Sequence, residues 1–285
     1  MFSRRWIINF LLIVLIIVFT YIGNRYDVKT GYQPDRNISR LTPDKVNSIL
    51  VQTADEIIEL ELSNGNWRIT RPLQWPANAV NIHRLLGITE SQTSSRLESD
   101  ALDLNKLGLG LPKALLQLND TTILFGGNNN IGDRRYIQID NMVYLLEDIH
   151  LPFISQGLNA LIDRRLLPAI LDPTAFDLGN LSFEQDDSGE WQSGADSKAT
   201  SEQISELVNS WTKLEASRIS RFNAADTPRK KITARLRDGR QVEFFLMSIA
   251  PRIIIANPQT GLQYHFSKDF YYQLLDIRDA QDGTG

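Results

Sequence analysis

The hydrophobic run from Trp6 to Ile22 constrains this chain most, because a run of this kind indicates that part of the chain folds in a lipid bilayer. The run carries no charge, and Asn9 and Thr20 are its clearly polar interruptions. As a helix rising 1.5 Å per residue it reaches roughly 25 Å, close to the thickness of a bilayer's hydrocarbon core. We therefore predict a single transmembrane helix at Trp6 to Ile22, through which the protein contacts the membrane.

The charges on either side of this run predict its orientation. Arg4 and Arg5 precede it, whereas Arg25 and Lys29 follow it and are partly offset by Asp27. Because the more cationic flank usually stays in the cytoplasm, we expect a cytoplasmic N-terminus and a folded region on the other side of the membrane. A cleaved secretory signal is the alternative, but the run is long for such a signal and the residues after it make a poor cleavage site.

Beyond the run, about 260 residues remain, enough for one large domain or two ordinary domains. The composition, with 42% hydrophobic and 22% charged residues, is typical of a globular protein. The chain has no cysteine, which excludes disulfides, thiolate metal ligands and cysteine nucleophiles. Its net charge of −4 argues against a general nucleic-acid-binding protein.

Hydrophobic periodicity predicts strands first and then a helix. Apolar residues alternate on both sides of Asn64-Gly65, a dipeptide that favours a tight hairpin turn. The spacing of Ile82, Leu85 and Leu86 is that of one face of an amphipathic helix. In this part of the chain we predict strands at 49–51, 58–62, 67–69, 114–118, 121–125, 135–139 and 142–146, with helices at 82–89 and 149–158.

The same order recurs about 120 residues later, which predicts an internal duplication. Thr200, with Gln203 three residues later, forms a capping-box pattern at the start of a helix that extends to Leu214. We predict the remaining strands at 181–183, around Trp191, and at 231–236, 241–247, 252–256 and 262–266, with a final helix at 267–277.

These patterns predict an α+β protein in which two similar repeated units of antiparallel β-sheet with packed helices follow one N-terminal transmembrane helix. The two units are expected to join near Arg164 to Thr174. The predicted segments are a cytoplasmic tail and transmembrane anchor at 1–27, a linker at 28–45, the first unit at 46–165, the second unit at 166–278, and a disordered tail at 279–285.

Candidate reactive residues are few. His83, His150 and His265 lack a second histidine at metal-binding helical spacing, so we expect them to pack or cap locally. The glycine-rich loop from Gly126 to Gly132 lacks the lysine and following helix of a phosphate-binding loop. Asp186-Asp187 could suggest paired acids, but a Ser-Gly turn beside them favours two solvated side chains. We therefore expect no catalytic residue, no cofactor and no metal site.

One cationic cluster suggests a docking surface. On the predicted strand at 231–236 and its extension, Arg235 and Arg237 alternate with apolar residues, so they share one sheet face. Together with Arg240 and Arg252, they could bind an acidic protein, an anionic glycan or lipid headgroups. The alternative is a solvated sheet face whose charge is neutralised by the acidic segment from Glu184 to Glu206.

Several motifs resemble those of a bacterial protein family catalogued as domain of unknown function 4340. They are Trp67–Leu73 (WRITRPL), Leu107–Pro112 (LGLGLP), Phe125–Ile137 (FGGNNNIGDRRYI) and the strand Val143–Leu145, and the resemblance extends from about Ile49 to Leu275. It implies an accessory role in the bacterial envelope, because members are often encoded beside ABC-transporter and gliding-type components. With the predicted anchor, it implies the inner membrane and a periplasmic C-terminal region. It assigns a function to no residue.

Two classes of function follow. The first is a noncatalytic, membrane-anchored envelope protein that binds or scaffolds protein partners, such as components of an ABC-type transport system, and does not bind nucleic acid. The alternative is an envelope enzyme or a glycan-binding or cell-wall-binding module with a cleft between its two units. Trp67, Trp75, Trp191 and Trp211 could stack on sugars there, but their apolar surroundings favour core packing.

Overall fold

The computed structural model describes residues 36–93, 95–129, 132–194 and 199–277. The predicted transmembrane helix at Trp6 to Ile22, residues 28–35 of the predicted linker at 28–45 and the predicted tail at 279–285 lie outside these residues. Within the described part, none of the helices combines the length and apolar character needed to cross a bilayer. The chain divides into two compact units at Ile38, and the architecture below belongs to the second unit, Ile38–Gly285.

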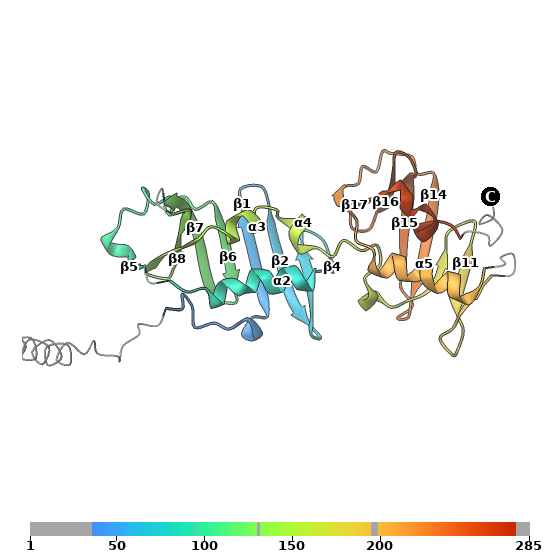
Figure 1. Ribbon diagram of the computed structural model, residues 1–285, viewed down its shortest axis with the longest axis horizontal. Helices are drawn as coiled ribbons and strands as arrows, with labels where there is room; N and C mark the ends of the chain where they lie inside the picture. The colour runs from blue at the N-terminus through green and yellow to red at the C-terminus, as the bar shows by residue number, and fades with distance from the viewer. Residues whose placement is uncertain (1–35, 94, 130–131, 195–198, 278–285) are drawn as a thin grey trace, which may run out of the picture. The chain divides into compact units, whose positions relative to one another are not determined.

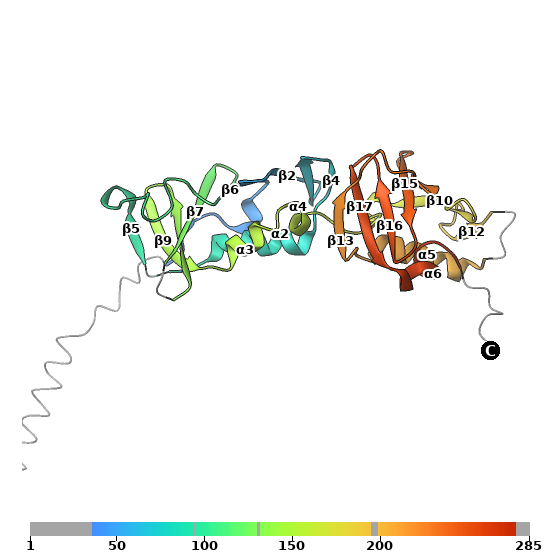
Figure 2. The same ribbon diagram turned by 90° about the horizontal axis from the view of Figure 1, so that it is seen from above.

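The first sheet contains nine strands, all paired antiparallel, in the order β4-β3-β2-β1-β6-β7-β8-β9-β5 (Figure 1). Helices α2 (Ala79–Leu86) and α3 (His150–Ile154) lie on one face of it (Figure 2). The strands are β1 (Ser48–Thr53), β2 (Ile57–Ser63), β3 (Asn66–Arg71), β4 (Trp75–Pro76), β5 (Arg96–Glu98), β6 (Ala114–Leu118), β7 (Thr121–Asn129), β8 (Arg134–Ile139) and β9 (Met142–Glu147).

The second sheet contains eight strands, also antiparallel, in the order β12-β11-β10-β14-β15-β16-β17-β13. Helices α5 (Ser201–Lys213) and α6 (Tyr271–Leu274) pack against it. The strands are β10 (Pro173–Asp177), β11 (Ser182–Gln185), β12 (Trp191–Ser193), β13 (Arg218–Arg221), β14 (Lys230–Leu236), β15 (Gln241–Ser248), β16 (Arg252–Asn257) and β17 (Leu262–Ser267).

The two sheets follow the same plan. When β10, β11 and β12 are matched to β1, β2 and β3, the remaining strands of the two sheets fall in the same spatial order, ending at β13 and β5. In each half, one amphipathic helix precedes the strand at the far edge of the sheet. Helix α2 lies between β4 and the edge strand β5, and helix α5 lies between β12 and the edge strand β13. The α+β class and the antiparallel sheets predicted from the sequence are confirmed.

The tight turns form where the sequence places residues that tolerate positive φ. Asn64 and Gly65, between β2 and β3, have φ values of 50° and 76°. Positive φ at both central residues gives a turn whose twist matches that of the flanking strands. Asn119 and Asp140 adopt φ values of 51° and 50° at the turns that follow β6 and β8. These hairpins set the register of the first sheet.

Helix α5 shows how local and core interactions agree. The Thr200 hydroxyl accepts the N–H of Gln203, and the Gln203 side chain accepts the N–H of Thr200, so the predicted capping box is formed. Trp211 of this helix is fully buried, with ring centroids 5.5 Å from Phe176 and 5.2 Å from Phe244. Its indole N–H donates to the carbonyl oxygen of Leu274 at 2.7 Å. The helix is thereby fixed to the core side of the second sheet.

Two helix predictions were too long. The helix expected at 149–158 is two short helices, α3 and α4 (Leu158–Leu161), because Gly157 between them adopts a φ of 59° that a continuing helix cannot accommodate. The helix expected at 267–277 is a 3₁₀ turn at Lys268–Phe270 followed by the single turn of α6. Its apolar residues pack on the core without extending the helix.

Besides the two-residue strand β4, strands β5, β10 and β13 were not predicted. Arg96–Glu98 and Arg218–Arg221 are short edge strands with charged residues, so they lack the alternation by which a half-buried strand is recognised. Pro173–Asp177 falls in the segment expected to join the two units. Its pairing with β14 shows a register shift between Pro173 and Ala175. Tertiary pairing therefore decided these three strands.

Candidate functional site

The four arginines of the predicted docking surface are exposed, and Arg235 lies on the outer face of the second sheet. Ile232, Ala234 and Leu236 on the same strand are buried, as the period-2 pattern predicts. An Arg235 guanidinium nitrogen donates to a carboxylate oxygen of Glu184 at 2.9 Å. This contact joins the arginine to the acidic segment that the sequence suggested as its neutralising partner.

The neighbouring arginines are also held within the chain. Arg237 Nε donates to Asp172 at 2.6 Å, and a second guanidinium nitrogen donates to the side-chain oxygen of Gln185 at 2.9 Å. The hydrogen bond to Asp172 raises the pKa of Arg237. Arg240 pairs with Asp238 two residues earlier, at 2.7 Å. Arg235 on β14 and Arg237 and Arg240 in the turn after it are therefore each paired with a carboxylate.

Arg252 lies apart from those pairs, at the start of β16. It contributes, with Arg218, to a positive environment around His265, whose pKa is lowered chiefly by partial burial and then by these two cations. The His265 ring nitrogen Nε2 lies 2.8 Å from the Ser220 hydroxyl on the adjacent strand. The structure therefore brings Arg252 close to Arg218 and His265, a grouping that the sequence did not predict.

The other histidines and the paired acids occupy local structural positions. His150 is partly buried, with Nε2 3.3 Å from the Ser91 hydroxyl, and burial lowers its pKa. His83 is exposed on α2. Asp186 accepts hydrogen bonds from Ser188 and neighbouring residues in an exposed turn. Among the described residues, no group of three or more His, Cys, Asp or Glu side chains is placed to hold a metal ion.

Two of the quoted sequence motifs meet on the outer face of the first sheet. The N–H of Gly127 donates to the carbonyl oxygen of Leu107 at 2.7 Å. A Cβ on Gly126 would lie 2.6 Å from that same oxygen and 2.9 Å from the Leu109 side chain, and a Cβ on Gly108 would lie 2.7 Å from Gly127 N. Glycine is required here because the two backbones approach too closely for a side chain.

A buried ion pair fixes this contact from the opposite side. Arg135 donates from Nε and Nη2 to the two carboxylate oxygens of Asp148, each at 2.6 Å, and its third nitrogen donates to the carbonyl oxygen of Gly126. The hydrogen bond from Arg135 is the largest cause that lowers the pKa of Asp148. A bidentate pair with little solvent access holds its geometry tightly. Gly126 and Gly127, at the start of the glycine-rich segment, are therefore held in a close structural contact.

A row of mainly apolar side chains crosses the outer face of the first sheet. Residues directly opposite each other in antiparallel strands project from the same face, so successive pairings define the row. Its apolar members are half-buried, except for Val143, which is 2% exposed, and Leu97, which is 54% exposed. We call this set the apolar row, and it consists of Ile57, Gln52, Leu115, Leu124, Gln138, Val143 and Leu97.

The matching row of the second sheet is polar. On the four strands β11, β10, β14 and β15, the residues paired in the same register are Ser182, Asp177, Thr233 and Glu243. They stand in the places of Ile57, Gln52, Leu115 and Leu124 of the first sheet. The two sheets therefore share a plan but differ in the side chains at this row.

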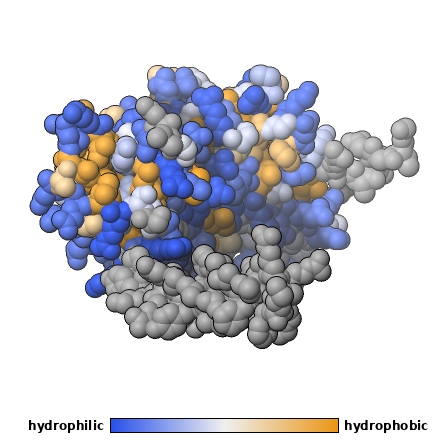
Figure 3. All heavy atoms as spheres, turned by 60° about the vertical axis from the view of Figure 1, so that its left-hand side comes forward, coloured by the Kyte–Doolittle hydropathy of each residue, from blue (hydrophilic) through white to orange (hydrophobic). Residues whose placement is uncertain are grey.

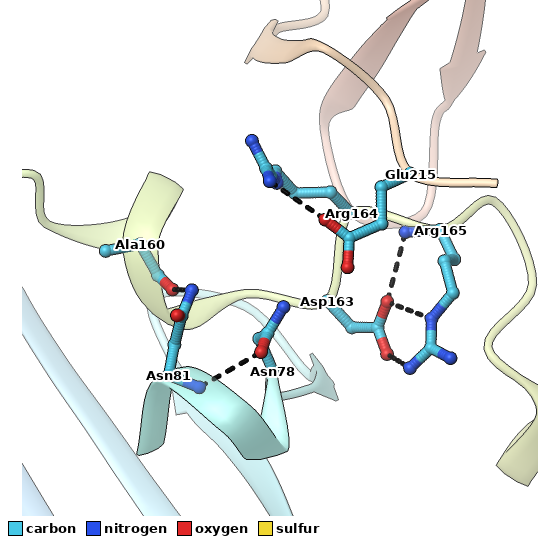
Figure 4. A network of polar contacts seen from close by, with 7 residues as sticks. All are labelled: Asn78, Asn81, Ala160, Asp163, Arg164, Arg165 and Glu215. Carbon is cyan, nitrogen blue, oxygen red and sulfur yellow. Dashed lines mark hydrogen bonds and ion pairs between the residues drawn. The ribbon is translucent and has the colours of Figure 1, made fainter. Parts of the chain in front are cut away.

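The chain passes from one sheet to the other through a buried polar segment (Figure 4). Asp163 is 2% exposed, and it accepts hydrogen bonds from the backbone N–H of Arg165 at 3.1 Å and from Arg165 Nε at 2.7 Å. The indole N–H of Trp75 donates to the carbonyl oxygen of Asp163 at 3.2 Å. Arg164 pairs with Glu215 at 2.8 Å. The connection is thus held by residues of both halves.

Two cavities are lined by residues of both halves. One, of about 370 Å³, includes Leu158 and Phe222, and the other, of about 650 Å³, includes Arg68 and Arg240. Pro72, Leu73, Thr260 and Gly261 border both. Trp75 lines the larger cavity but is 6% exposed, and Trp191 and Trp211 are also buried, which agrees with the predicted core packing of these indoles.

The architecture defines a class of α+β proteins built from two antiparallel sheets of matching topology. A family model described as "Domain of unknown function (DUF4340)" matches residues 67–234. The match covers more than half of the chain and reaches from β3 of the first sheet to β14 of the second, so this chain belongs to that family. Comparison with curated proteins and with solved structures found no match.

Proposed function

We propose that this protein is a noncatalytic binding protein of the bacterial envelope, anchored in the inner membrane and presenting its folded region to the periplasm. The observation that supports a binding role most directly is the contrast between Leu115 and Leu124 and their polar counterparts Thr233 and Glu243. Where two sheets share one plan, the outer face that keeps apolar side chains is the better candidate for contact with another molecule.

The membrane location rests on the uncharged run from Trp6 to Ile22 and on the cationic residues before it. The accessory role, as a scaffold for components of an ABC-type transport system, rests on the resemblance to a family whose members are encoded near such components. A fixed anchor keeps the folded region close to other membrane proteins. This raises its effective concentration for a weak contact.

The duplicated plan of the two sheets is also part of the proposal. We infer that the chain arose by internal duplication, after which the outer face of the second sheet acquired the ion pairs Arg235–Glu184 and Lys231–Glu243. Surface pairs of this kind contribute little to stability, but they keep a sheet face soluble. The first sheet carries the ion pair Arg71–Glu59 on β3 and β2, but the positions that match Thr233 and Glu243 are the uncharged Leu115 and Leu124.

Crosslinking in intact bacterial membranes, followed by mass spectrometry of the attached proteins, tests this function. We expect recovery of envelope proteins, with transporter subunits among them. Recovery of no protein, together with retention of a specific glycan by the purified full-length chain, would contradict the scaffold role. Protease treatment of sealed spheroplasts tests the location, because a periplasmic region must be digested there.

The cavity of about 650 Å³ favours one alternative, a ligand-binding module. Its volume is in the range of small-molecule sites, and Arg68 and Arg240 would favour an anionic group such as a sugar acid. Arg240 is exposed and already paired with Asp238, however, which weakens this electrostatic attraction. Binding of acidic oligosaccharides by the full-length protein, lost in Arg68→Ala, would support the alternative over the scaffold.

A further inference from the structure

We propose that the outer face of the second sheet binds a phosphate group between Arg218 and Arg252, beside His265. These residues lie on β13, β16 and β17, and β17 is the middle one of the three neighbouring strands. The ligand is either a free phosphate or the phosphate of a larger molecule, such as a lipid headgroup. This inference goes beyond the proposed scaffold role and does not depend on it.

The strand register brings the three side chains together. Arg218 lies directly opposite His265, and Arg252 lies opposite Ser267, two residues further along β17. Residues that are opposite each other, or two apart on one strand, project from the same face of a sheet. At about 4.8 Å between strands and about 3.4 Å per residue, the Cα atoms of the two arginines are roughly 12 Å apart. Two long arginine side chains can therefore approach one small anion from opposite sides of β17.

The cluster faces away from the core. Ile219, Tyr264 and Ile253, which neighbour the three residues in the sequence, are buried. Because side chains alternate along a strand, the cluster itself projects from the outer face. Both arginines are exposed and His265 is half-buried. A ligand in solution or in a membrane can therefore reach these side chains.

The charge of the two arginines is not neutralised by the chain. Among the described residues, no carboxylate forms an ion pair with Arg218 or Arg252, whereas Lys231 of the same sheet is paired with Glu243. Asp269, which follows β17, instead accepts a hydrogen bond from the hydroxyl of Ser267 at 2.8 Å. An unneutralised pair of cations on one face creates a local positive potential that attracts an anion.

His265 reports the same imbalance of charge. Its pKa is lowered first by partial burial and then by Arg218 and Arg252, and no carboxylate of the described residues is among the causes. The Ser220 hydroxyl, on the edge strand β13, lies 2.8 Å from its Nε2 and holds the ring in place. The ring is therefore positioned to sense any anion that binds between the two arginines.

The donors suit phosphate better than a carboxylate. Each arginine presents several N–H groups in a planar fork that matches the oxygens of phosphate. A tetrahedral phosphate can accept hydrogen bonds from several directions at once, whereas the two oxygens of a carboxylate lie in one plane. Arg218 and Arg252 approach from two different strands, so a tetrahedral oxyanion is the better match.

Apolar side chains next to the cluster provide contact for the rest of a phosphorylated ligand. Ile254 lies directly opposite His265 and is half-buried. Further along this face, the rings of Phe222 and Phe245 are in contact, with centroids 6.1 Å apart. Hydrophobic groups bordered by hydrophilic residues also occur on the face shown in Figure 3. The arginines, and not these apolar neighbours, therefore define the class of ligand.

The test uses the full-length protein in nonionic detergent, inorganic phosphate as the probe and the NMR signal of His265 as the readout. The chain has three histidines, so His265→Gln identifies the signal. The test variant is Arg218→Gln/Arg252→Gln. The matched control is Arg71→Gln/Lys231→Gln, which removes the same charge from two exposed cations that are paired with carboxylates. Acetate at equal ionic strength is the comparison anion, and thermal unfolding checks that each variant folds.

A phosphate bound between the arginines offsets their charge, so it should raise the pKa of His265. We expect this rise to saturate with phosphate concentration and to weaken as potassium chloride is added. Binding should be at least fivefold weaker in Arg218→Gln/Arg252→Gln and unchanged in Arg71→Gln/Lys231→Gln. An equal rise with acetate, or equally weakened binding in the two double variants, would overturn the proposal.

Two further probes distinguish the sources of the phosphate. Glucose 1-phosphate is added to the protein in detergent, and the protein is also placed in phosphatidylcholine nanodiscs with or without phosphatidic acid. If glucose 1-phosphate raises the pKa of His265 as inorganic phosphate does, the site takes soluble phosphates. If only phosphatidic acid does so, it takes a lipid headgroup. No rise with inorganic phosphate, glucose 1-phosphate or phosphatidic acid would overturn the proposal.

Discussion

Arg135 and Asp148 form a bidentate ion pair in which both hydrogen bonds measure 2.6 Å and the side chains are 6% and 16% exposed. Arg135 also donates to the carbonyl oxygen of Gly126, at the point where the chain approaches Leu107. One side chain of β8 therefore joins Asp148, just after β9, to β7, beside the point where Leu107 packs on Gly127. This interaction makes several specific predictions possible.

Arg135→Met should lower the free energy of unfolding by about 3 kcal/mol, because it leaves the Asp148 carboxylate without its buried partner. Urea denaturation of the full-length protein in detergent measures this loss. Lys231→Met is the matched control: its pair with Glu243 has side chains 56% and 36% exposed, so a change below about 1 kcal/mol is expected. Equal effects of the two substitutions would show that burial of the Arg135 pair contributes nothing.

The same pair predicts acid sensitivity. Because Arg135 lowers the pKa of Asp148 in the fold, the unfolded chain binds the proton first as the pH falls. The stabilisation is therefore complete above the unfolded pKa of about 3.9, and it is lost as the pH falls through the lower, folded pKa. Unfolding measured from pH 5 to pH 2 should show a smaller pH dependence for Asp148→Asn than for the natural chain. An identical slope would contradict this assignment.

His150 predicts a second pH dependence, at higher pH. Burial lowers its pKa, so the fold favours the neutral ring, whereas the unfolded chain takes up a proton near pH 6.5. Stability should fall as the pH decreases below 6.5, and His150→Gln should reduce that fall. His83→Gln, at an exposed position of α2, is the control substitution. Thermal unfolding at pH 7.5, 6.5 and 5.5 compares the two variants.

Gly126→Ala should destabilise the protein by about 1–3 kcal/mol, because the new Cβ would meet Leu107 O at 2.6 Å and Leu109 at 2.9 Å. It should also increase hydrogen exchange at Gly127, whose N–H bonds to Leu107 O. Gly87→Ala provides the control, since its Cβ would meet nothing within 4 Å and its backbone is helical. That substitution should be neutral or slightly stabilising. The reverse order of effects would refute the close-packing account of Gly126.

The sequence predicted those elements whose local signals agree with their tertiary environment. The Asn64-Gly65 turn and the capping box of Thr200 and Gln203 depend on neighbouring residues, and both occur in the structure. Strand β13 (Arg218–Arg221) depends instead on pairing with β17. The residues next to β13 in the sequence give no indication of that pairing. Long-range pairing of that kind leaves little trace in a single sequence.

The candidate sites were less predictable than the fold. Period 2 placed Arg235 correctly on an outer face, but its partner Glu184 is 51 residues away, and Asp172 lies 65 residues before Arg237. The contact between Leu107 and Gly127 likewise needed the strand register. The contrast between Leu115 and Thr233 was accessible in principle, because the repeat was predicted and the two residues occupy matching strands. Comparing outer-face positions of the two repeats would have revealed it.

Photocrosslinking in intact bacteria tests the central claim, that the outer face of the first sheet contacts a partner, most directly. A photoreactive amino acid replaces Leu115 in one strain and Thr233 in another, at matching positions of the two sheets. After irradiation, position 115 should yield a discrete crosslinked protein that position 233 does not. Crosslinks of equal yield and identity at both positions, or at position 233 alone, would contradict the account.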